Sequence, residues 1–203
     1  MPEYRMRIPA QSRNAFCLIA CIAFGVLTLV FQLSTAYGAT GLAPILGEEQ
    51  LAANLQRTPV SYRTQYPEGS IIIDTAERYL YFITGNGTAL RYGIAVGKEG
   101  YQWEGSMKVT KKREWPDWRP PKDMRARAKA QGKELPKVVE GGPNNPLGAR
   151  AIYLGRSEYR SHGTTQPSSI GEAASSGCIR MLNEHVIDLY DRVKIRARVV
   201  VLP

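Results

Sequence analysis

The sequence predicts a mostly β domain. Nineteen Gly and thirteen Pro among 203 residues indicate a turn-rich chain of short elements. Short runs of β-branched and aromatic residues follow one another from Ser70 onward, and only one good helical period appears, late in the chain. With 43% apolar residues the chain can bury a core, which excludes wholesale disorder and a collagen-like chain.

The first 36 residues have the pattern of an export signal. Residues 1–14 hold three arginines and one glutamate, and Ala15–Phe31 is then a run of 17 residues without a charge. Small residues follow where a signal peptidase would cleave. We predict a signal peptide over residues 1–36. An uncleaved membrane anchor is the alternative, since the run is long for a signal core and short for a spanning helix.

Removal of the export signal changes the charge and the cysteine count. The whole chain has a net charge of +9 and three cysteines. Loss of residues 1–36 removes three arginines, one glutamate and two cysteines, leaving +7 and a single thiol, Cys178. A lone cysteine in an oxidising compartment is either buried and inert or kept for its reactivity. For an exported protein, the basic charge indicates an anionic cell envelope as surroundings rather than nucleic acid.

A linker over residues 37–59 and a folded domain over residues 60–203 are expected after the signal. The linker has a mixed composition without a sustained period, and one helical turn is expected around Glu48–Leu55. In the domain, Gly85–Gly87 has hairpin turn chemistry. The predicted strands are 70–74, 78–83, 89–96, 107–113, 149–154, 158–161 and 198–202.

Residues 115–146 interrupt the strands as a long irregular insertion with two tryptophans and six prolines. A stretch of this length in a compact domain is either a functional lid or rim, or a loop packed on the domain through its tryptophans. A short basic helix is expected within it over residues 123–129. The insertion is therefore a candidate part of a substrate cleft.

The one good helix is predicted to begin at Asn183 as its N-cap. Its apolar face follows the i, i+3, i+4, i+7 pattern: Val186, Leu189, Tyr190 and Val193. His185 lies in the first turn and off that face, so we expect a solvated side chain there.

The other histidine and the exported cysteine form the candidate chemical site. His162 ends a predicted strand beside Gly163, and Cys178 follows 16 residues later, after Gly177. An imidazole can take a thiol proton and later give one to a leaving amine, and Gly177 would let backbone N–H groups face a developing oxyanion. Arg180 would share the side of Cys178 in an extended segment and would fit a substrate carboxylate. These residues favour catalysis over a buried structural cysteine.

Two motifs at this spacing resemble a known family. Tyr159-Arg160-Ser161-His162-Gly163-Thr164, followed by Ser175-Ser176-Gly177-Cys178-Ile179-Arg180-Met181, is similar to the signature of L,D-transpeptidases of the YkuD type, which include ErfK, YbiS, YcfS and YnhG. Further similarity runs through Gly69–Asp74, Trp115–Trp118 and Gly141–Gly148. The resemblance covers roughly residues 60–203.

The resemblance implies a fold, an activity and a set of roles. The fold would be a β sandwich or barrel with one or two short helices, acting on peptidoglycan stem peptides. Cys178 would be the nucleophile, His162 the general base and acid, the Gly163 carbonyl the group that orients the imidazole, and the N–H groups of Gly177 and Cys178 the oxyanion hole. Substrate contacts would come from four side chains: Arg180, Ser176, Tyr153 and Trp118. No cofactor is expected, and one cysteine with two separated histidines does not make a zinc site.

Two positions depart from the family pattern. Ser176 stands where many members have a histidine, so any help from a second ring is absent. Ser161 stands where an apolar residue usually precedes the catalytic histidine, and a core-facing hydroxyl without a partner would cost about 1–3 kcal/mol.

The resulting hypothesis is an exported L,D-transpeptidase that forms 3→3 cross-links or attaches a protein to the wall. The alternatives are an L,D-carboxypeptidase with the same site and a non-catalytic wall-binding domain in which Cys178 is structural. A sortase-like enzyme fits less well, because its arginine normally lies on a separate strand.

Overall fold

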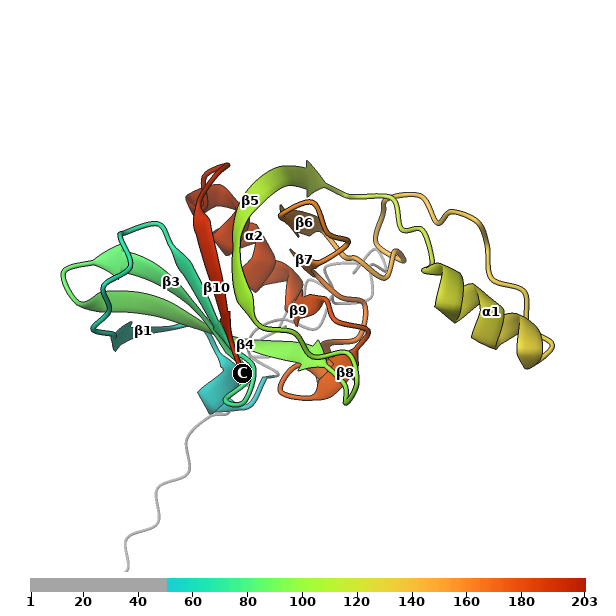
Figure 1. The fold of residues 1–203 in the computed structure, drawn as a ribbon, viewed down its shortest axis with the longest axis horizontal. Helices are drawn as coiled ribbons and strands as arrows, with labels where there is room; N and C mark the ends of the chain where they lie inside the picture. Colours follow the sequence, from blue (N-terminus) through green and yellow to red (C-terminus); the bar gives the residue numbers. More distant parts are fainter. Residues whose placement is uncertain (1–50) are drawn as a thin grey trace, which may run out of the picture. The chain divides into compact units, whose positions relative to one another are not determined.

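The computed structural model describes residues 51–203, which form ten strands, two α-helices and two short 3-10 helices (Figure 1). The signal sequence and residues 37–50 of the predicted linker lie outside the described residues. The elements are η2 (Ala53–Leu55), β1 (Thr58–Ser61), β2 (Ile71–Asp74), β3 (Tyr79–Gly85), β4 (Thr88–Gly97), β5 (Gly105–Glu114), α1 (Lys122–Ala130), β6 (Arg150–Leu154), β7 (Arg160–His162), η3 (Pro167–Ser169), β8 (Ala173–Ser175), β9 (Ile179–Met181), α2 (Asn183–Arg192) and β10 (Arg198–Leu202).

The strands make one closed, barrel-like sheet. Its order is β4-β3-β2-β10-β5-β6-β7-β9, and β9 pairs back with β4 to close the ring. β1 and β8 pair with β4 outside this ring. The mostly β prediction is therefore confirmed. Closure leaves few free strand edges, which makes the sheet a rigid frame for side chains on its surface.

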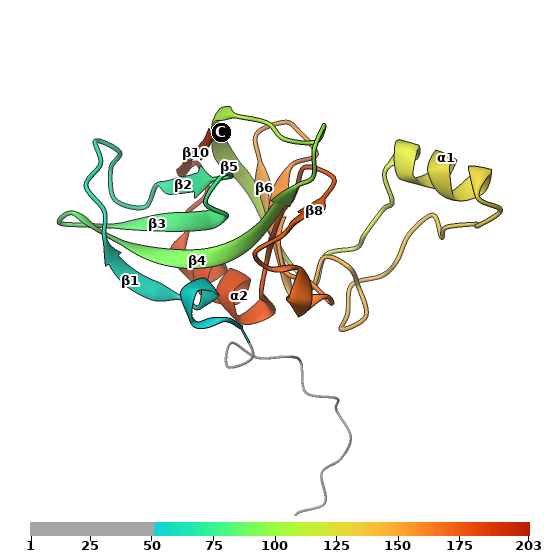
Figure 2. The ribbon, with the colours of Figure 1, turned by 90° about the horizontal axis from the view of Figure 1, so that it is seen from below.

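The core lies inside the sheet and under α2. Alternate residues of the strands point inward, as the period of two requires, and they include the fully buried Ile73, Leu80, Ile94 and Ile152. α2 adds its predicted apolar face to this cluster through Val186, Leu189 and Val193. Figure 2 shows α2 beneath β4.

The predicted strands are present, with ends that differ by a few residues. The hairpin turn at Gly85–Gly87 is confirmed, since Gly85, Asn86 and Gly87 all have positive φ. β7 begins at Arg160 rather than residue 158 and includes His162. β1 begins at Thr58, so the last two residues of the predicted linker already pair with β4. β1, β8 and β9 were not predicted as strands, because none of these three- or four-residue segments has a run of β-branched or aromatic residues.

Residues 115–149, named here the arm, connect β5 to β6. The arm contains α1, which confirms the expected basic helix, and α1 has no buried residue. In both ribbon views α1 lies out beyond β6 and β8 (Figures 1 and 2). The arm is closed at its base by paired hydrogen bonds between Trp118 and Val139 and by Asn145, whose amide donates to the carbonyls of Val139 and Glu140 at 2.9 Å.

Two expectations about α2 were wrong. His185 is buried, with 1% of its surface exposed, and its ring lies edge-on to Tyr92 at 5.6 Å between centroids. The reason is that His185 precedes Leu189 by one helical turn and so shares its buried face. Asn183 is the first helical residue and not the N-cap; Leu182 holds that position. Within residues 51–203, neither α-helix combines the length and hydrophobicity that a bilayer span requires.

Candidate active site

The pairing of β7 with β9 places the predicted residues on one face of the sheet. The strands are parallel, with Ser161 beside Ile179 and His162 beside Arg180. Ser161 and Ile179 are buried in the core, so His162 and Arg180 face the opposite side. Cys178 precedes β9 by one residue and shares the face of Arg180 by alternation. The three side chains therefore emerge on the same face, with Arg180 beside His162 and Cys178 two residues before Arg180.

Ser175 holds the turn that presents Cys178. The Ser175 Oγ donates to the Cys178 carbonyl at 2.5 Å and accepts from the Gly177 N–H at 3.1 Å. Gly177 has φ +99°, and a Cβ there would lie 2.8 Å from the Tyr159 ring, so only glycine fits this turn. Because the Gly177 N–H is bonded to Ser175, it is free to meet an oxyanion only if that bond opens.

Trp103 covers the same turn from the β4–β5 loop. Its Nε1–H donates to the Gly177 carbonyl at 2.8 Å. Its indole stacks on Tyr159, with 4.4 Å between ring centroids and 8° between planes. Trp103 and Ser175 were missed as site residues. Ser175 could have been found from its place beside Gly177, whereas Trp103 lies 74 residues away in the sequence and carries no local signal.

His162 is held as a neutral imidazole of one tautomer. Its Nδ1 lies 2.6 Å from the Gly163 carbonyl oxygen. A carbonyl can only accept, so Nδ1 carries the proton and the lone pair is on Nε2. Burial, reinforced by the charges of Arg160 and Arg180, lowers the pKa of His162 from 6.5 to about 3, although the bond to Gly163 works in the opposite direction. The ring is therefore uncharged at neutral pH and able to accept a proton.

Asn183 fixes the loop that carries Gly163. Its Nδ2 donates to the Thr164 carbonyl at 3.0 Å and its Oδ1 accepts from the Ala149 N–H at 3.0 Å. A Cβ on Gly163 would overlap the Asn183 side chain. The residue predicted as a helix cap thus holds the Gly163–Thr164 loop, whose Gly163 carbonyl orients His162.

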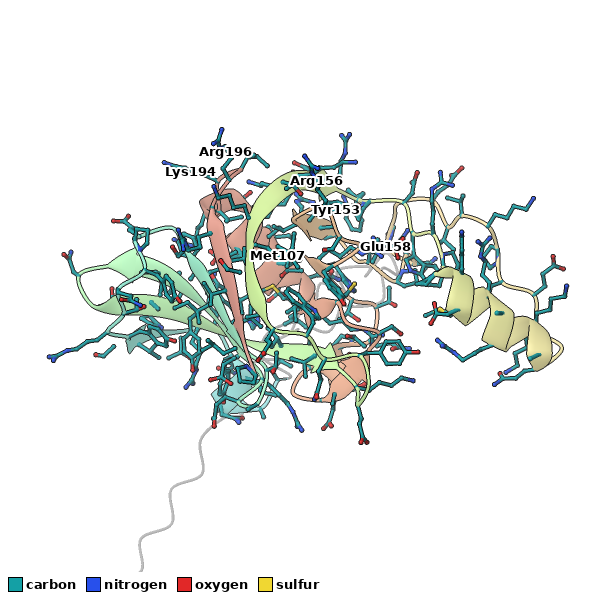
Figure 3. The ribbon with its side chains drawn as sticks, viewed as in Figure 1. Met107, Tyr153, Arg156, Glu158, Lys194 and Arg196 are labelled. Carbon is teal, nitrogen blue, oxygen red and sulfur yellow. The ribbon has the colours of Figure 1, made fainter. Side chains whose placement is uncertain are left out.

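The Cys178 thiol and Arg180 are both half-buried. The Cys178 Sγ lies 3.8 Å from the Glu158 carbonyl oxygen, on the β6–β7 connection. Figure 3 shows Glu158 on the part of this connection nearer to α1, with Tyr153 close by. Burial lowers the pKa of Arg180 and the neighbouring Cys178 opposes that shift. The Arg180 Nη1 donates to Gln166 Oε1 at 3.4 Å.

The other three residues predicted to contact substrate lie in different elements of the fold. Ser176 is half-buried in the turn before Cys178, and Tyr153 pairs with Arg160 in the sheet. Trp118 is half-buried at the base of the arm, where it pairs with Val139. Within residues 51–203 no three His, Cys, Asp or Glu side chains come together as a metal-binding group.

A family model decides the assignment. The model of the YkuD-type L,D-transpeptidase catalytic domain matches residues 68–201. The chain belongs to this family. Its resemblance to the family's motifs is thereby confirmed, and the match includes the whole Cys178 and His162 region.

Curated relatives of this L,D-transpeptidase domain agree. The probable L,D-transpeptidase YbiS of Escherichia coli is 38% identical over 134 residues, which are 64% of this chain and 43% of that protein. The probable L,D-transpeptidase ErfK/SrfK of Salmonella typhimurium is 36% identical over 137 residues, again 43% of its length. The chain thus spans less than half the length of these relatives.

Solved structures share the fold. A Brucella melitensis protein whose structure is titled a probable carnitine operon oxidoreductase is 44% identical, with a TM-score of 0.50 over 78% of this chain and 99% of that one. An L,D-transpeptidase from Mycobacterium smegmatis has a TM-score of 0.50 at 14% identity, over 66% of this chain and 58% of that one. The latter similarity concerns the fold alone.

Proposed function

We propose that this chain is an exported cysteine L,D-transpeptidase that acts on peptidoglycan stem peptides. The observation that carries the proposal is that β7 and β9 present His162 and Cys178 on one face, with Cys178 two residues before the register partner of His162 and the Gly163 carbonyl bound to the imidazole, in a domain of this family. A thiol and an oriented, neutral imidazole on one face of the sheet suit acyl transfer. For this reason we favour transpeptidase activity over the oxidoreductase activity that is named for the Brucella melitensis structure.

In the first half-reaction, Cys178 attacks the amide between the third, dibasic residue of a tetrapeptide stem and its terminal D-alanine. The lone pair on His162 Nε2 takes the thiol proton as the C–S bond forms, and the Cys178 N–H faces the oxyanion. The His162 imidazolium then protonates the departing amine of D-alanine. The products are free D-alanine and a thioester on Cys178.

In the second half-reaction, an amine attacks the thioester and gives its proton to His162 as the new amide forms. The thiol is regenerated when that proton returns to sulfur. A stem amine as acceptor would give a 3→3 cross-link, and a protein amine would give a wall-attached protein. Arg180, Ser176, Tyr153 and Trp118 would contact the stem, with Arg180 facing a substrate carboxylate. Residues 1–36 would direct export to the periplasm or cell envelope, with the membrane reached only through this segment.

Product analysis on defined muropeptides tests the proposal. Wild-type protein should convert tetrapeptide stems to 3→3 dimers with release of D-alanine, and Cys178→Ala should form none. Shortened monomers without dimers would indicate the L,D-carboxypeptidase instead.

Covalent trapping tests the nucleophile separately. A carbapenem mimics the acyl donor, so intact mass spectrometry should find one adduct on wild type and none on Cys178→Ala. An equal adduct on both proteins would exclude Cys178 as the nucleophile. Slow labelling of the thiol at neutral pH, together with no adduct on wild type, would favour the wall-binding alternative.

A further inference from the structure

A groove with excess positive charge lies beside the candidate active site. It has a volume of about 530 Å³ and is formed by β5, the start of the arm, β6 and β7. The lining residues that matter here are Lys111, Arg113, Trp115, Arg119, Tyr153 and Arg160. Trp115 is one of the large apolar side chains that remain exposed in residues 51–203, with 41% of its surface accessible.

The two carboxylates of the groove are already engaged. Glu114 pairs with Arg150 at 3.3 Å, and the Asp117 Oδ1 accepts from the Gly141 N–H at 3.1 Å. By contrast, none of the four cations that line the groove makes an ion pair with a residue of the described range 51–203. The groove therefore has an excess of positive charge, because its four cations face a single carboxylate, Asp117, that has no ion-pair partner in residues 51–203.

Tyr153 organises two of these cations. The Lys111 Nζ lies 5.3 Å and the Arg160 Cζ 5.9 Å from the centre of its ring. The Arg160 Nε is buried and has no hydrogen-bond partner among residues 51–203. A buried donor without a partner is costly, so an acceptor that reaches Arg160 Nε when the side chain turns toward the groove would be favoured.

Sheet register joins the groove to the nucleophile. Lys111 pairs with Tyr153, and Tyr153 pairs with Arg160. Ser161 and Ile179 are register partners. The residues just before them, Arg160 and Cys178, therefore lie side by side, and Cys178 ends the row that runs across the strands from Lys111. The row crosses three strand spacings of about 4.8 Å, roughly 14 Å in all, which about four extended residues span.

We propose that this groove binds the carboxylates of the stem peptide and aligns its scissile amide with Cys178. The inference rests on the proposed function and specifies the ligand as a short extended peptide that carries more than one carboxylate. Arg113, Arg119 and Arg160 pair with its carboxylates, while Trp115 and Tyr153 contact its apolar parts. The groove thereby sets substrate specificity and takes no part in proton transfer.

Binding to the full chain with Cys178→Ala tests the groove without turnover. Calorimetry would compare a tetrapeptide stem with the same stem whose carboxylates are carboxamides. Adding Arg113→Gln and Arg119→Gln should raise the Kd of the free-acid stem about tenfold. The matched control, Lys108→Gln with Arg198→Gln, removes two exposed cations of β5 and β10 outside the groove and should leave the Kd within about twofold. The carboxamide stem should bind weakly to every variant.

Three results would overturn the inference: equal stem affinity in the groove and control variants, equal affinity of the Cys178→Ala protein for both stems, or displacement of the stem by a short polyphosphate at matching concentration. The last would make the groove a general anion site. Carbapenem acylation of the groove variant, with Cys178 restored, should proceed at the wild-type rate, because that small ligand needs only the site at Cys178. Groove-dependent binding without wild-type turnover would count against the proposed function alone.

Discussion

At the scale of single residues, Ser161 is a buried hydroxyl without a hydrogen-bond partner in residues 51–203, beside His162, the proposed general base. Ser161 is 1% exposed, and its Oγ has no hydrogen-bond partner among the described residues. This is the costly case expected from the sequence for a hydroxyl facing the core. Ser161→Ala should raise stability by about 1 kcal/mol, because it removes a desolvated hydroxyl at the cost of a small void. That corresponds to a rise of roughly 2–4 °C in Tm. Ser175→Ala, which loses two bonded contacts, should lower the Tm; a fall for both variants would contradict this reading.

His162 makes stability depend on pH. Its pKa is about 3 in the fold and 6.5 in an unfolded chain, so the unfolded state binds the extra proton between these values. The stabilisation is complete above pH 6.5 and is lost as the pH falls toward 3. In His162→Gln this loss should be absent. The decrease in unfolding free energy from pH 7 to pH 4.5 should therefore be smaller in this variant than in wild type, by about 2–3 kcal/mol. Urea unfolding at both pH values measures it, and parallel pH profiles would refute it.

At the scale of elements, the Ser175–Cys178 turn is kept in place by contacts from elsewhere in the chain. Trp103→Phe retains the ring stack on Tyr159 but loses the hydrogen bond to the Gly177 carbonyl. A net loss of about 1 kcal/mol in the positioning of Cys178 should slow carbapenem acylation about fivefold. Trp115→Phe, outside the turn, is the control in the same mass-spectrometric time course. Equal rates for the two variants would mean that Trp103 does not position the turn.

The elements that the sequence predicted best are those with a clear local signal. The β2–β4 meander and β10 follow from β-branched runs and a glycine turn, and His162 ends a strand as predicted, whereas β9 after Cys178 was not predicted. The burial of His185 and the hydrogen bond from Asn183 to the Thr164 carbonyl could not be predicted, because both depend on how α2 packs against distant strands. The position of Trp103 over the Cys178 turn also depends on tertiary contacts, and no local sequence pattern connects Trp103 to Cys178.

At the scale of the whole molecule, the closed sheet and the arm have separable roles. The strands that carry His162 and Cys178 belong to the ring closed by β9 and β4. The arm contributes no buried residue between positions 122 and 138, and α1 reaches the β4–β5 loop through an exposed contact, in which Arg127 donates to the Tyr101 hydroxyl at 2.9 Å. We therefore expect stability and the candidate site to depend on the ring rather than on α1.

Replacing residues 122–138 with a short Gly-Ser linker tests this separation. The base of the arm remains, because the Trp118–Val139 pairing and Asn145 lie outside the replaced segment. We expect a Tm within about 3 °C of wild type and carbapenem acylation of Cys178 within about threefold. Asn145→Ala is the contrasting variant. Asn145 is 1% exposed, and its side chain makes hydrogen bonds to the backbone of Val139, Glu140 and Leu147, so their loss should lower stability by about 2–3 kcal/mol. If shortening the arm costs as much as Asn145→Ala, α1 is part of the folding unit, and the ring alone does not hold the site.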